Sequence, residues 1–157
     1  MKDERVVTVP VVNRKRLEGV LTVSDITDSF MEAYDSEILS TAHTRYCNIV
    51  DTLEGTLLIG DEKAYYTKGK VLVAAANPDL MESYISKHDL VILGNRYESQ
   101  LCAIEMEADC IVVCEGAPVS LTIRKLAQER GCTVISTPLI PLLQHVLLIR
   151  VCQSVIL

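Results

Sequence analysis

Four short runs of apolar residues recur between residues 70 and 137 and dominate the pattern of this chain. They are rich in Val, Ile and Leu and too short to form independent helices, so each predicts a buried strand: Val71–Ala76, Leu90–Leu93, Cys110–Cys114 and Cys132–Ile135. The segments between them carry apolar residues at helical spacing. Strands that alternate with helices predict an α/β fold with a mostly parallel sheet and helices on both faces.

Helix-boundary residues support this alternation. Asn77-Pro78-Asp79 combines an N-cap residue, a first-turn proline and an acid that suits the positive end of a helix dipole, so a helix is expected to begin there. Pro118 opens another helical segment, and Gly131 stands where a glycine commonly ends a helix. Upstream, the pattern predicts a helix over Thr44–Leu53 and a short strand over Thr56–Gly60.

The N-terminal part of the chain has a different pattern. Residues 5–10 alternate as a strand, Asn13–Arg16 form a polar turn, and Leu17–Val23 form a second strand. Ser24-Asp25 then caps a helix. The predicted unit is strand, turn, strand, helix, and residues 34–43 continue as a polar connection or a further helix.

Composition narrows the classes of partner. The chain has 157 residues, of which 49% are hydrophobic, and a formal net charge of −6. The negative charge, with no basic run beyond Arg14-Lys15-Arg16, argues against a nucleic-acid partner. The apolar stretches are too short to cross a bilayer, so no membrane partner is expected.

The residues that could carry catalysis or bind a metal are scattered. The six cysteines include no C-x-x-C pair, and the three histidines stand apart from one another. Cys110 and Cys114 share one face of a predicted strand, which suits buried thiols of a cytoplasmic protein. No metal site is expected in this chain, and no nucleophile–base pair or glycine-rich phosphate loop can be assembled. We therefore assign no catalytic residue.

The first predicted strand is apolar and contains Pro10 and Val11. It is followed by the pattern Gly-x-x-Thr-x-x-Asp, formed by Gly19, Thr22 and Asp25, at the start of the predicted helix. This pattern resembles the second half of a CBS motif. The helix and strand that open the family's motif would have to precede residue 5. The resemblance implies a partial CBS β-β-α unit, with its connector, over residues 1–43.

The same resemblance implies that Thr22 and Asp25 bind an adenine nucleotide. A hydroxyl and helix N-terminal amides can hold a phosphate, and a carboxylate three residues later can bridge two ribose hydroxyls. The implied ligands are AMP, ATP and diadenosine polyphosphates. The alternative stays open that Ser24 or Asp25 only caps the helix and that Thr22 is only a strand residue.

A second resemblance covers residues 44–138. The motifs of a DRTGG domain follow one another in order: Arg45-Tyr46-x-Asn48, Lys68-Gly69-Lys70-Val71, Gly94-Asn95-Arg96 and Thr137-Pro138. The motif that names the family departs from its usual form, because Asn95-Arg96 is followed by Tyr97-Glu98 and not by Thr-Gly-Gly. No ligand role is therefore carried over to it.

A DRTGG domain behind a CBS half-motif is similar to the regulatory insert of CBS-domain family II inorganic pyrophosphatases. In that family the insert controls a manganese-dependent catalytic core through bound adenine nucleotides. The resemblance implies a non-catalytic regulatory fragment that forms a homodimer, with manganese held in the parent's catalytic domain. Two alternatives are a ligand-free dimerisation or scaffold module and the DRTGG region of a phosphate acetyltransferase. The CBS half-motif counts against the acetyltransferase.

Two predicted strand-to-helix turns lie at the edge where open α/β sheets place ligands. The first contains Asn95 and Arg96, and the second contains Glu115 and Gly116. Arg96 can bind a carboxylate or phosphate, or pair with Glu98 or Glu115 of the same chain or of a second subunit. Pairing is the interpretation we favour, and the four residues are candidates for an anion site or an interface.

Residues 139–157 form an unusually apolar tail. Codons for this segment, when read two bases later, can spell the polar continuation of the family, including Ile-Asn-Gln-Ser. One hypothesis is therefore a frame change after Pro138. The alternative is a genuine final helix from Pro141 to about Cys152.

Overall fold

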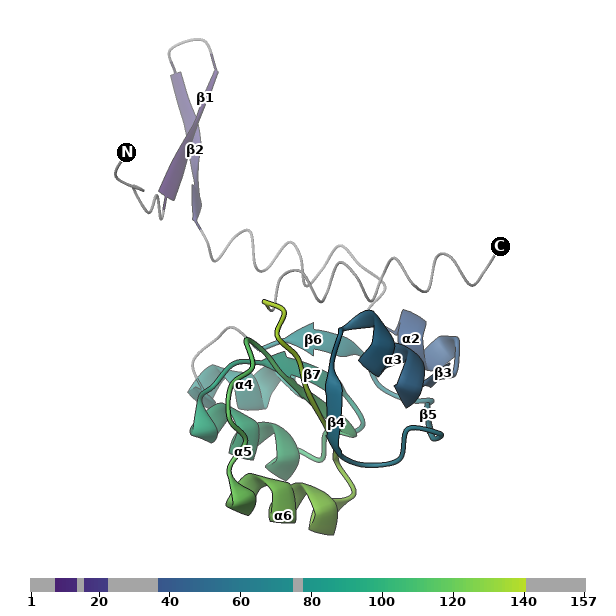
Figure 1. Ribbon diagram of the computed structural model, residues 1–157. Coiled ribbons are helices and arrows are strands. Elements are labelled where there is room, and N and C mark those ends of the chain that lie inside the picture. The colour runs from purple at the N-terminus through teal and green to yellow at the C-terminus, as the bar shows by residue number, and fades with distance from the viewer. Residues whose placement is uncertain (1–7, 14–15, 23–36, 75–77, 141–157) are drawn as a thin grey trace. The chain divides into compact units, whose positions relative to one another are not determined.

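The structure is a computed structural model that describes residues 8–13, 16–22, 37–74 and 78–140 (Figure 1). The predicted helix cap at Ser24-Asp25 and the tail from residue 141 onwards lie outside these residues. The chain divides into two compact units, Met1–Asp35 and Ser36–Leu157. In the described residues, the first contains a two-stranded sheet and the second a five-stranded one.

A β-hairpin forms the described part of the first unit. β1 (Thr8–Asn13) pairs antiparallel with β2 (Arg16–Thr22), and its last residue lies opposite the first residue of β2. The register shifts between Val11 and Val12, where Glu18 is an extra residue in β2. The predicted turn over Asn13–Arg16 is therefore shorter than expected, since its two end residues pair with each other. The Asn13 side chain also donates a 2.9 Å hydrogen bond to Glu18 Oε1.

The second unit is built on a sheet with strand order β4-β9-β8-β7-β6. Its strands are β4 (Thr56–Ile59), β6 (Val71–Val73), β7 (Leu90–Leu93), β8 (Cys110–Val113) and β9 (Thr133–Ser136). The last four are parallel, and β4 joins the edge antiparallel to β9. All residues of β7 and β8 are buried, as expected of central strands that are covered on both faces.

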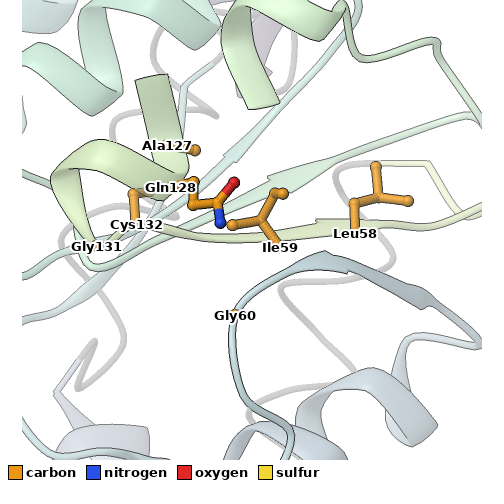
Figure 2. Close-up of a pocket in the computed structure, with 7 residues that line it drawn as sticks. All are labelled: Leu58, Ile59, Gly60, Ala127, Gln128, Gly131 and Cys132. Carbon is orange, nitrogen blue, oxygen red and sulfur yellow. The ribbon is translucent and has the colours of Figure 1, made fainter. Parts of the chain in front are cut away.

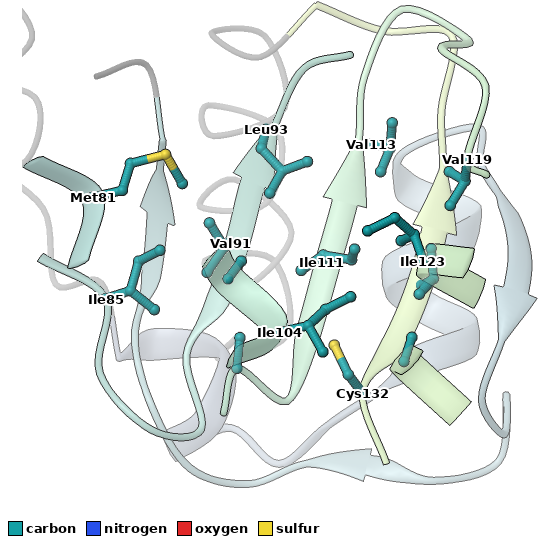
Figure 3. Packing of buried hydrophobic residues seen from close by; sticks show 14 of the residues in the cluster. Met81, Ile85, Val91, Leu93, Ile104, Ile111, Val113, Val119, Ile123 and Cys132 are labelled. Atoms are coloured by element: carbon teal, nitrogen blue, oxygen red, sulfur yellow. The ribbon is translucent and has the colours of Figure 1, made fainter. Parts of the chain in front are cut away.

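Three helices cover one face of this sheet: α4 (Pro78–Tyr84), α5 (Tyr97–Glu105) and α6 (Leu121–Arg130). Figure 3 shows the core beneath them, where Val91 and Ile111 of the strands pack with Ile104 of α5 and Ile123 of α6. Val134 of β9 belongs to the same cluster. These positions alternate along each strand, as a pleated sheet requires. The predicted helical segments between the strands are confirmed.

Smaller elements cover the opposite face. They are α2 (Ile38–Thr41), α3 (Tyr46–Thr52) and a two-stranded ladder of β3 (Thr44–Arg45) with β5 (Tyr65–Tyr66) (Figure 1). Their buried side chains, including Ile49 and Tyr66, pack against Leu90, Ile92 and Val112. The mostly parallel sheet with helices on both faces is therefore confirmed.

The boundaries of several elements differ from the prediction. α6 begins at Leu121, because the Ser120 hydroxyl accepts a 3.2 Å hydrogen bond from the N–H of Ile123 and caps the helix there. Pro118 precedes it in an irregular segment. At the other end of α6, Gly131 has a φ of 71° and ends the helix in the left-handed conformation, as predicted. β6 ends at Val73, and residues 75 and 76 of the predicted strand lie outside the described residues.

Candidate functional site

The two predicted turns lie side by side at the carboxyl edge of the sheet. Leu93 of β7 pairs with Val113 of β8, and the Cys114 N–H donates a 2.9 Å hydrogen bond to the Leu93 carbonyl. The turns therefore leave neighbouring strand ends about 5 Å apart. The structure thus brings the segment of Asn95 and Arg96 next to that of Glu115 and Gly116.

The buried side-chain amide of Gln100 holds the turn that contains Asn95 and Arg96. Gln100 is only 2% exposed, and its Nε2 donates a 3.3 Å hydrogen bond to the Gly94 carbonyl. Its backbone N–H donates to the Arg96 carbonyl at 3.2 Å. Arg96 is the N-cap residue of α5 in an extended conformation, and its side chain makes no capping hydrogen bond. Asn95 and Arg96 are both exposed, so their side chains remain accessible at the edge.

The expected pairing of Arg96 within its own chain is not observed. Over the stretches that the structure describes, no ion pair joins its guanidinium to Glu98 or Glu115, although both acids are exposed. The contacts found in these stretches involve other residues: an ion pair of Lys87 with Glu107 at 3.0 Å, and a hydrogen bond between His88 Nδ1 and Asp109 Oδ1 at 3.0 Å.

The second turn uses its amides internally. Glu115 and Gly116 have positive φ values of 59° and 62°. The Glu115 N–H donates to the Leu139 carbonyl at 3.0 Å, and the Gly116 N–H donates to the Thr137 carbonyl at 2.8 Å. Backbone donors that an anion would need are therefore already hydrogen-bonded. The carboxylate of Glu115 is exposed on a turn whose backbone is held by these hydrogen bonds. This arrangement suits a protein interface better than an anion-binding site.

The predicted nucleotide-binding residues lie in the first unit. Thr22 ends β2, is partly buried and pairs with Thr8. Asp25 lies outside the described residues. The structure therefore gives the position of Thr22 at the end of β2, and its role in nucleotide binding stays a prediction.

Sequence reasoning missed a groove at another edge of the second unit. It is open, has a volume of about 420 Å³ and is lined by Leu58, Ile59, Gly60, Ala127, Gln128, Gly131 and Cys132 (Figure 2). The two contributing segments are far apart in the chain, so no local motif could have indicated it. Burial raises the pKa of the Cys132 thiol to about 12, which keeps it protonated and a poor nucleophile at neutral pH. The groove therefore offers apolar contacts and one carboxamide but no catalytic group.

The described stretches contain no group of three or more His, Cys, Asp or Glu side chains placed to hold a metal ion. None of the helices in these stretches has the length and apolarity needed to cross a membrane. Their cysteines, Cys47, Cys102, Cys110, Cys114 and Cys132, are free thiols.

Comparison with known proteins agrees with both resemblances. The chain is 35% identical over 139 residues to a cobalt-dependent inorganic pyrophosphatase of Clostridium perfringens, covering 88% of the chain. It is 26% identical over 135 residues, 86% of the chain, to a probable manganese-dependent inorganic pyrophosphatase of Thermotoga maritima. The chain spans about a quarter of the length of these two relatives, as the coverage of 25% in each case shows.

A solved structure is also similar. It contains the CBS and DRTGG domains of the regulatory region of Clostridium perfringens pyrophosphatase, complexed with the activator diadenosine tetraphosphate. The TM-score is 0.70 at 33% identity, over 91% of this chain and 63% of that chain. The chain is thus homologous to a pyrophosphatase regulatory region, as the motifs predicted. The model of the DRTGG domain matches residues 48–139, more than half of the sequence, and the chain therefore belongs to the DRTGG domain family.

Proposed function

We propose that this chain is an adenine-nucleotide-responsive regulatory module of a metal-dependent inorganic pyrophosphatase. The observation that carries the proposal is the similarity to a regulatory region whose structure contains an activating diadenosine tetraphosphate. The similarity extends over 91% of the chain and so includes most of the hairpin unit as well as the DRTGG domain.

In this proposal Thr22 and Asp25 bind the nucleotide. Thr22 lies at the carboxyl end of β2, where its hydroxyl can donate to a phosphate oxygen. The carboxylate of Asp25, three residues later, would accept hydrogen bonds from ribose hydroxyls. AMP, ATP and diadenosine polyphosphates share both of these chemical groups.

The DRTGG domain would connect two copies of the module and relay the change on nucleotide binding. Such a relay requires a ligand that binds two arrangements of the protein unequally. Hydrolysis of diphosphate, and the manganese or cobalt ions that it needs, would belong to a catalytic domain outside this chain. The free thiols suit a cytoplasmic protein.

Isothermal titration calorimetry of the full chain with AMP, ATP and diadenosine tetraphosphate tests the proposal. We expect binding that is lost in Thr22→Val and in Asp25→Asn. Asp51→Asn is the matched control, since Asp51 is an exposed carboxylate on α3 in the other unit. No heat with any of the three nucleotides at millimolar concentration would leave only the ligand-free scaffold. Hydrolysis of diphosphate by the purified chain with manganese or cobalt would refute its regulatory assignment.

A further inference from the structure

We infer that the carboxyl edge of the DRTGG sheet is a self-complementary contact surface between two copies of the chain, in which Arg96 of each copy pairs with Glu115 of the other. The inference rests on the proposed homodimer and specifies its surface.

The first argument is the state of the charges. Arg96 and Glu115 lie on adjacent turns, both exposed. In the described residues neither takes part in an ion pair. A two-fold contact uses the same patch on both partners, so a patch that carries an unpaired cation beside an unpaired anion matches itself after rotation. Each copy would then supply one Arg96 and one Glu115, which gives two equivalent ion pairs.

The second argument is the rigidity of the turns. Glu115 is held in the left-handed region, and its N–H and that of Gly116 are bonded to the segment after β9. Arg96 precedes the first turn of α5, whose start is braced by Gln100. A contact between preformed turns loses less conformational entropy than one between mobile loops.

Glu115 is the better partner than Glu98. Glu98 lies in the first turn of α5, where the positive end of the helix dipole already stabilises a carboxylate. Glu115 follows β8 and lies five residues before the N-cap Ser120 of α6, so it has no such stabilisation. Pairing with a cation from a second copy would therefore stabilise the carboxylate of Glu115 more than that of Glu98.

Apolar side chains at the same helix starts supply contact area. Tyr97, the first residue of α5, is 43% exposed, and Leu121, the first residue of α6, is 76% exposed. Because both helices follow parallel strands, both begin at the carboxyl edge. Tyrosine and arginine are enriched at protein interfaces, whereas isolated exposed leucines are common. The patch thus combines an aromatic anchor with complementary charge.

Charge reversal on the full chain tests the inference. We expect Arg96→Glu and Glu115→Arg each to raise the dimer dissociation constant about tenfold or more, since each places two like-charged pairs in the contact. Mixing the two variants should restore association as a heterodimer, because one chain then carries two acids and the other two arginines. Sedimentation velocity gives the dissociation constants, and native mass spectrometry distinguishes the heterodimer from the two homodimers.

Lys125→Glu and Glu129→Arg are the matched controls, because both are exposed on the outer side of α6 and reverse the same charges. They should leave the dissociation constant unchanged and mix in statistical proportion. A wild-type chain that stays monomeric at high micromolar concentration overturns the inference, as does statistical mixing of Arg96→Glu with Glu115→Arg. Calorimetry with diadenosine tetraphosphate on the same variants tests nucleotide binding separately. The proposed nucleotide binding and the inferred contact surface can therefore be refuted independently of each other.

Discussion

The hydroxyl of Thr137 donates a 2.6 Å hydrogen bond to the carbonyl oxygen of Leu53, 84 residues earlier in the chain. Leu53 follows the last residue of α3 and is fully buried, and Thr137 follows β9 and is 2% exposed. The Leu139 N–H donates in turn to the same hydroxyl at 3.2 Å. One side chain thus ties the end of the last strand to the layer that covers the second face of the sheet.

Replacing Thr137 with valine should destabilise the chain by about 1–3 kcal/mol, because the Leu53 carbonyl is left buried without its donor. Urea unfolding followed by circular dichroism measures the loss. Thr137→Ser keeps the hydroxyl and loses only a methyl group, so it should retain most of the stability. Equal losses in the two variants would show that packing matters here and the hydrogen bond does not.

The sharp turn before β6 yields a second prediction. Gly69 has a φ of 88°, and a Cβ atom there would overlap the carbonyl oxygen of His88. The same turn is fixed by Asp89, whose carboxylate accepts hydrogen bonds from the N–H groups of Lys70 at 3.0 Å and Ser86 at 2.7 Å. The backbone therefore has little room to move away from a side chain.

Gly69→Ala should consequently cost more stability than Gly131→Ala. Gly131 has a similar φ of 71°, but a Cβ atom there would meet no neighbour within 4 Å. The control should lose only the backbone strain, about 1–2 kcal/mol, whereas Gly69→Ala adds the steric overlap. Chemical denaturation of both variants gives the difference directly. Similar losses would mean that the turn yields to the added methyl group.

A third prediction concerns the start of α6. Ser120→Ala removes the hydroxyl that accepts from the Ile123 N–H and should cost about 1 kcal/mol. Ser120→Asp keeps an acceptor at the N-cap and adds a charge that the helix dipole favours, so it should be as stable as the wild type or more so. Thermal unfolding ranks the three proteins, and any other order would contradict the capping role.

The sequence predicted this fold well where the signals are local. Strand and helix periods lie within a few residues, so the strands from Val71 to Ile135 and the cap at Gly131 could be found directly. The direction of β4 could not, because its apolar pattern is the same whether it runs parallel or antiparallel to β9. The bond between Thr137 and Leu53 joins segments that only tertiary packing brings together.

In the candidate site, too, the sequence predicted some features, whereas others depend on tertiary packing. Parallel topology predicted that the turns of Arg96 and Glu115 share one edge, and they do. The sequence could not show that the amides of Glu115 and Gly116 bind the segment after β9, because that depends on where a later strand ends. That contact shifts the interpretation of this edge from an anion site towards an interface.

The buried ionisable groups predict a loss of stability in alkali. Burial raises the pKa of the Cys132 thiol from 9.0 to about 12. Burial likewise raises the pKa of Cys110, Tyr46 and Tyr66. Each group holds its proton more tightly in the folded chain, so between the two pKa values the folded state binds more protons than the unfolded state. The stabilisation from Cys132 is therefore complete below about pH 9 and is lost as the pH rises towards 12, by about 1.4 kcal/mol per pH unit.

Cys132→Ala should make this alkaline decline shallower, because it removes one of the groups that titrate only on unfolding. The measurement is the free energy of unfolding in urea at a series of pH values from 8 to 11. Val134→Ala is the matched control, since Val134 is fully buried in the same cluster but does not titrate. It should lower stability by a similar amount at every pH and leave the slope unchanged. If both variants kept the wild-type slope, another buried group would be responsible for the decline, with Tyr46 and Tyr66 the next to replace by phenylalanine.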